Sequence, residues 1–137
     1  MQGREFLELA RELLALGTKP RHWRGVIVHA YYAVFLESRE AMARWNLPVP
    51  PRHLAHHQIR QRLVFATYPD LKMIGYALEE LGKHRATASY DLRPHALFSS
   101  AKDAQDDVQL AADALALLDA IDADPVRRPA AVACIKP

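Results

Sequence analysis

An apolar residue recurs every three or four positions between residues 97 and 118, and this spacing constrains the fold more than any other feature of the chain. The residues of this stripe are Leu97, Ala101, Ala104, Val108, Ala111, Leu115 and Leu118. Such a period matches the turn of an α-helix, whereas a half-buried strand alternates apolar and polar residues. Small side chains at many of these positions favour close packing against other helices. We therefore predict a helix from Pro94 to about Ile121, packed in a bundle.

Four earlier segments have the same helical periodicity and are separated by residues that end or begin helices. The predicted helices span residues 2–16, 20–45, 52–67 and 69–90. Gly17 ends the first helix, and three prolines within residues 46–51 end the second. The second helix carries two apolar stripes, so we expect it to be the central element. The predicted fold is all-α: an antiparallel four-helix up-and-down bundle with one short extra helix.

The length of 137 residues suits a single domain with a substantial core. We place this domain at residues 1–122 and treat residues 123–137, which contain three prolines, as a C-terminal tail. We expect Val126 to Ile135 to dock against this molecule or a neighbouring one.

Composition excludes several classes of protein. The lone cysteine, Cys134, cannot form an intramolecular disulfide, and five glycines form no phosphate-binding loop. No apolar run reaches the roughly 18 residues of a membrane-spanning helix, and the amino terminus does not read as a secretory signal. We expect a cytoplasmic protein without a cofactor and without a membrane contact.

The net charge of +2 conceals an uneven distribution of charged residues. Residues 19–62 carry eight Lys or Arg and two Glu, whereas residues 95–124 carry one Lys and seven Asp. This asymmetry predicts self-association or an anionic partner. Asp103, Asp106, Asp107 and Asp113 read as the solvated face of the last helix.

Two segments carry a family resemblance. The first runs from Arg24 through His29, Tyr31 and Tyr32 to Phe35, and the second includes Arg85, Tyr90 and Asp91. Together they resemble the HEPN domain family, in which an Ala-Tyr-Tyr-Ala-x-Phe segment lies in a long early helix. An Arg and a Tyr-Asp pair then precede the last long helix, and the resemblance covers residues 6–121.

The resemblance implies a small helical bundle, commonly a homodimer, that binds RNA or a nucleotide. Some such domains are metal-independent ribonuclease toxins of toxin–antitoxin or defence systems. Active members carry an Arg and a His separated by four to six intervening residues, since RNA cleavage needs a proton acceptor and a cation for the phosphate. Arg24 and His29 have this spacing, as do Arg52 and His57, and the trailing Tyr31 favours the first pair.

The predicted site therefore has Arg24 and His29 as catalytic residues and Tyr31, Arg85, Tyr90 and Asp91 as substrate-binding residues. Tyr90 stands where active members usually carry His, which leaves a second interpretation open. This is a catalytically inactive HEPN interaction module that dimerises and docks a partner such as a nucleotidyltransferase antitoxin. His53, His56 and His57 have no nearby carboxylate that completes a metal-binding motif, so we predict no metal site.

Overall fold

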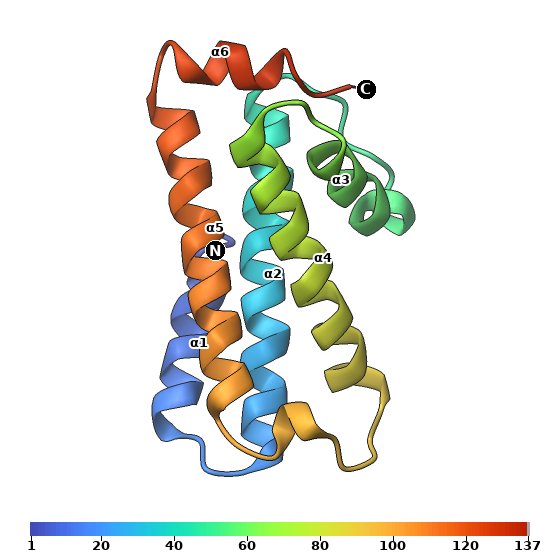
Figure 1. Ribbon diagram of the computed structural model, residues 1–137, viewed down its shortest axis with the longest axis vertical. Helices are drawn as coiled ribbons and strands as arrows, with labels where there is room; N and C mark the ends of the chain where they lie inside the picture. The colour runs from blue at the N-terminus through green and yellow to red at the C-terminus, as the bar shows by residue number, and fades with distance from the viewer. Residues whose placement is uncertain (137) are drawn as a thin grey trace.

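The longest helix, α2 (Pro20–Arg44), is the central element of the fold (Figure 1). It packs against α1 (Glu5–Leu16), α4 (Pro69–Tyr90) and α5 (Lys102–Ala123). The computed structural model describes residues 1–136, and over that range it contains helices and connecting loops but no strand. The all-helical, bundle-like fold predicted from the sequence is thus confirmed.

The four long helices follow the long axis of the molecule and alternate in direction. In Figure 1, α1 and α4 descend, whereas α2 and α5 ascend. The short helix α3 (Ala55–Val64) packs mainly against α4. Within residues 1–136, no helix is both long enough and apolar enough to cross a bilayer.

Three predicted helix boundaries need correction. The first helix begins at Glu5 and not at Gln2. The third is a 3-10 turn over Arg52–Leu54 followed by α3, which ends at Val64. Pro94 does not open the last helix: a short 3-10 turn, Ala96–Phe98, follows it, and α5 begins only at Lys102.

The core lies between α2 and the helices around it. Its largest fully buried side chains include Ile27, Met42, Ile59, Leu71, Ile74 and Phe98. Glu37 of α2 is buried as well, and it accepts hydrogen bonds from the backbone N–H and the Nε of Arg4, both at 2.8 Å. The same guanidinium donates to Asp119 of α5 at 2.8 Å, so Arg4 joins the central helix to the last long one.

The C-terminal segment docks on the bundle, as the sequence led us to expect. It forms helix α6 (Arg127–Val132), which lies across one end of the bundle in Figure 1. Ala131 and Ile135 are buried, and Arg127 bonds to Tyr68 and Asp70. Pro137, the last residue of the predicted tail, lies outside the described residues.

Helices α3 and α4 approach each other closely at Gly75. A Cβ atom built there would lie 2.6 Å from the backbone nitrogen of Val64 and 2.9 Å from the carbonyl carbon of Leu63. Only glycine permits this approach, because these contacts are with backbone that cannot turn aside. Gly82 of the same helix is different, since its Cβ would meet only the Tyr31 ring at an ordinary 3.6 Å.

We expect Gly75→Ala to lower the free energy of unfolding by about 1–2 kcal/mol, because overpacking against α3 outweighs the better helix propensity of alanine. Gly82→Ala is the matched control and should be stabilising by roughly 0.5–1 kcal/mol. Urea unfolding of both variants measures the difference. Equal effects of the two substitutions would contradict the proposed close contact.

Candidate functional site

The structure separates the predicted site residues into different places. Tyr31 and Arg85 come together between α2 and α4. Arg24 and Asp91 meet at the C-terminal end of α4. His29 lies apart from both groups, against Phe6 of α1.

Arg24 holds the end of α4 through main-chain contacts. Its Nη1 donates to the carbonyl oxygens of Ala88 at 3.0 Å and Asp91 at 2.6 Å, and its Nη2 donates to that of Arg93 at 3.0 Å. The guanidinium also lies 4.1 Å from the centre of the Phe98 ring. Carbonyl groups at a helix C-terminus lack partners within the helix, and a cation there is favourable. The arrangement gives Arg24 a structural task.

His29 is half-buried and packs on an aromatic ring. Its ring centre lies 5.7 Å from that of Phe6, and its Nδ1 is buried without a hydrogen-bond partner within residues 1–136. Burial lowers the pKa of His29, because desolvation disfavours the imidazolium. The surroundings of His29 therefore favour the neutral form of its ring.

A second histidine, His56 of α3, belongs to an aromatic cluster with two residues of α2. The Tyr31 hydroxyl and His56 Nδ1 share a hydrogen bond of 2.5 Å. The His56 ring also stacks on Phe35, with ring centres 4.0 Å apart and an interplanar angle of 6°. With Nδ1 engaged by Tyr31, Nε2 is the ring nitrogen left to meet a ligand.

Arg85 covers this cluster from the α4 side. Its guanidinium carbon lies 5.1 Å from the centre of the Tyr31 ring and 6.0 Å from that of Tyr32, which is cation–π geometry. Its Nε is buried and has no hydrogen-bond partner within residues 1–136. A buried donor without an acceptor is costly, so this atom marks a place where an acceptor would be stabilising.

Arg85 also lines a groove between α3 and α4, which we call the first groove. Arg60, Lys83 and Phe65 line it too, together with one carboxylate, Glu79. Lys83 lies 3.8 Å from Glu79 in an exposed pair. Three cations face one anion here, so the groove favours an anionic ligand.

Burial favours the neutral forms of Tyr31 and His56 in this cluster. Burial raises the pKa of Tyr31 to about 12, although nearby Arg85 opposes this change. Burial lowers the pKa of His56, and Arg85, Arg60 and Arg39 lower it further by repelling a proton. A neutral imidazole beside several fixed cations is an arrangement that can bind a phosphate and accept or donate a proton.

Tyr90 and Asp91 lie at the far end of α4 from Gly75. Tyr90 is exposed, and Asp91 pairs with Arg93, whose Nε donates to it at 2.9 Å. Hydrogen bonds from Arg93 are the main reason that the pKa of Asp91 falls to about 2. Neither residue contributes to the first groove.

The predicted exposure of one acidic residue, Asp107, is wrong. Asp107 was predicted on the solvated face of the last helix, but it is only 3% exposed. It faces His84 of α4, whose Nδ1 lies 2.9 Å and 3.0 Å from the two carboxylate oxygens. Burial raises the pKa of Asp107 to about 6, although His84 opposes this change.

His56 was missed as a site residue, although one signal pointed to its segment. Residues 41–69 contain four arginines and three histidines but no Asp or Glu. Within residues 1–136, no three His, Cys, Asp or Glu side chains gather as a metal ion would require.

No protein-family model, no curated protein and no solved structure matches this chain. The geometry and chemistry of the chain itself must therefore indicate its function.

We expect Arg24→Gln to lower the free energy of unfolding by about 2 kcal/mol, because it removes a cation and its hydrogen bonds from the end of α4. Arg21→Gln, at an exposed position of the same helix, is the control and should change little. Urea unfolding followed by circular dichroism measures both. An unchanged stability of Arg24→Gln would contradict this structural role of Arg24.

Asp107→Asn should change how stability depends on pH. The pKa of Asp107 is about 6 in the folded chain and about 4 in the unfolded chain. The wild-type protein should therefore lose stability relative to the variant as the pH rises through this window, by on the order of 2 kcal/mol. Urea titrations at pH 4.5 and 7.5, with exposed Asp113→Asn as control, test the sign. A difference that does not vary with pH would contradict it.

Proposed function

We propose that this protein is an RNA- or nucleotide-binding domain of the HEPN type, built as an up-and-down four-helix bundle. Its site for phosphate is the first groove, beside the cluster of Tyr31, His56 and Arg85. The single observation that carries this proposal is the buried Arg85 Nε, which has no hydrogen-bond partner within residues 1–136.

Phosphate chemistry fits the groups around that atom. A guanidinium presents several N–H donors in a plane and binds phosphate oxygens in pairs. Arg60 and Lys83 line the same groove and add positive charge. An anion placed there would also favour protonation of His56, whose pKa is lowered by burial and by the nearby Arg85 and Arg60.

The proposal assigns no cleavage step to Arg24 and His29. The guanidinium of Arg24 already donates to four main-chain carbonyl oxygens, and His29 packs against Phe6. A cation for a phosphorane and a proton acceptor must face the same phosphate. The two side chains contact different helices, which argues against a cleavage step at this pair.

A second candidate is the interaction module, which would dimerise or dock a partner such as a nucleotidyltransferase. Two exposed apolar side chains favour this candidate: Tyr90 is 78% exposed and Leu92 is 83% exposed. They lie beside Arg93 in a shallow concavity at the end of α4. Binding of a partner there would leave the first groove free, so both functions are compatible with one molecule.

We expect Arg85→Gln to weaken the binding of a nucleoside 5′-monophosphate and of RNA by about tenfold or more, because charge-assisted bonds to phosphate are lost. Arg85→Lys should recover part of the affinity, since it keeps the charge but not the planar fork. Arg11→Gln, exposed on α1, is the control. The measurement is fluorescence anisotropy with a labelled RNA and competition by the monophosphate.

Loss of affinity in Arg85→Gln with an unchanged thermal midpoint supports the proposed site. Equal affinities of Arg85→Gln and the wild-type protein would overturn it. Equal loss in Arg11→Gln would reduce the result to a nonspecific effect of net charge and would also count against the groove.

A further inference from the structure

We infer that the ligand is single-stranded RNA that crosses the exposed ring of Phe65, with phosphates in the first groove on one side and in a second groove on the other. This inference rests on the proposed function and extends it. The second groove is lined by Gln58, Gln61, Arg62, Phe65 and Lys136. The C-terminal segment thereby acquires a role in the site.

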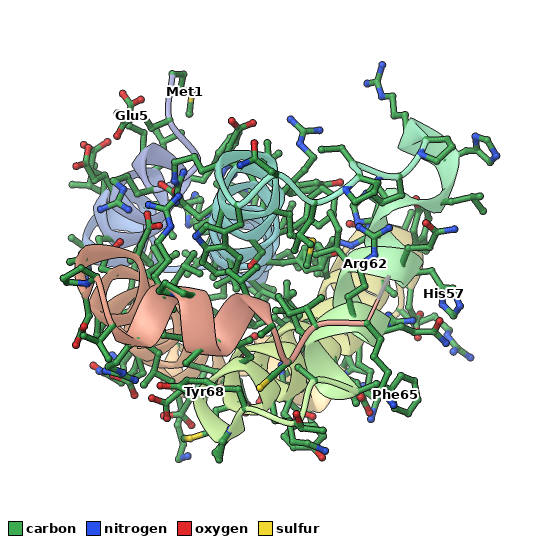
Figure 2. The ribbon with its side chains drawn as sticks, turned by 90° about the horizontal axis from the view of Figure 1, so that it is seen from above. Met1, Glu5, His57, Arg62, Phe65 and Tyr68 are labelled. Carbon is green, nitrogen blue, oxygen red and sulfur yellow. The ribbon has the colours of Figure 1, made fainter. Side chains whose placement is uncertain are left out.

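Phe65 lines both grooves, as does Gln61, and it is the aromatic residue at their boundary. It caps the C-terminal end of α3, and its side chain is 65% exposed although it is large and apolar. Figure 2 shows Phe65 projecting away from the bundle on the same side as His57. An aromatic ring held outward between two concavities that carry cationic side chains is an arrangement on which an unstacked base can rest.

The docked tail brings Lys136 to the second groove. Ile135 is buried, and the backbone N–H of Thr67, just after α3, donates to the carbonyl of Cys134 at 3.3 Å. Arg127 anchors the other end of the tail by donating to the Tyr68 hydroxyl at 3.1 Å. The last described residues are thus fixed beside α3, which orders the segment carrying Lys136.

Positive charge is present on both sides of the ring. The first groove contributes Arg60, Lys83 and Arg85 against Glu79. Among residues 1–136, the second groove contributes Arg62 and Lys136 and no carboxylate side chain. Arg62 is positioned by a hydrogen bond to the carbonyl of Pro48. A polyanion that touches both grooves meets five cations, whereas a mononucleotide in one groove meets three at most.

The lining favours single-stranded RNA over other polyanions. In a duplex the bases are stacked and their faces are hidden, so a single aromatic platform has nothing to bind. The amide side chains of Gln58 and Gln61 both donate and accept hydrogen bonds. A ribose 2′-hydroxyl does the same, and DNA lacks that group.

The test compares four ligands: a nucleoside 5′-monophosphate, an eight-nucleotide single-stranded RNA, the same sequence as DNA, and the RNA duplex. Phe65→Ala should weaken binding of the single-stranded RNA about tenfold, through loss of base stacking. Tyr76→Ala removes another exposed aromatic ring, one that lines neither groove, and should have no effect.

Lys136→Glu should weaken binding of the single-stranded RNA by about threefold or more, since a cation that contacts phosphate is lost. It should also make the dependence of the affinity on salt less steep. The same variant should leave the monophosphate unaffected, because Lys136 lines only the second groove. Arg11→Glu carries the same change of charge on α1 and serves as the control.

The outcomes separate the two proposals. Equal binding of RNA by Phe65→Ala, Lys136→Glu and the wild-type protein would overturn this inference while leaving the role of Arg85 intact. DNA or duplex RNA binding as tightly as single-stranded RNA would overturn it too. Loss of monophosphate binding in Arg85→Gln tests the proposed function separately.

Discussion

Helix α2 is covered along its length by three other helices, and the rest of the structure depends on this burial. A helix packed in this way buries polar side chains along its middle, so neighbouring elements must satisfy them. Glu37 receives Arg4, Tyr31 meets His56, and Arg24 reaches the end of α4. Each of these contacts fixes one surrounding segment. The polar groups of the central helix thus determine where the amino terminus, α3 and the end of α4 are placed.

The apolar periodicity predicted the helical class and the bounds of the central helix and α4 closely, because buried stripes recur with the helical repeat. It could not predict local features that depend on three-dimensional contacts. Pro94 has the φ angle of a first helical turn, yet Phe98 is drawn into the core beneath Arg24, and the chain forms a separate 3-10 turn. Asp107 looked solvated because its neighbours in sequence are acidic, but His84 on another helix gives it a buried partner.

The candidate site was predicted in part. Tyr31 and Arg85 were selected from sequence segments far apart, and the packing of α2 against α4 brings them together. The pairing of Arg24 with His29 followed from their spacing in sequence, but residues five apart on a helix point about 140° away from each other. His56 became part of the cluster only through the position of α3. The spacing of residues along the chain predicts which of them share a face of one helix. It does not predict which residues meet between helices.

The docked C-terminal segment has a consequence for the order in which the molecule is completed. Its contacts are with Thr67, Tyr68 and Asp70, and with Arg44 and Asp122 through Arg128. Three different helices must therefore already be in place before it can dock. The first groove is formed by residues 60–86, which a ribosome completes some 50 positions earlier. In a nascent chain the residues of the first groove are thus present before Lys136. The second groove is complete only when the segment that carries Lys136 has docked.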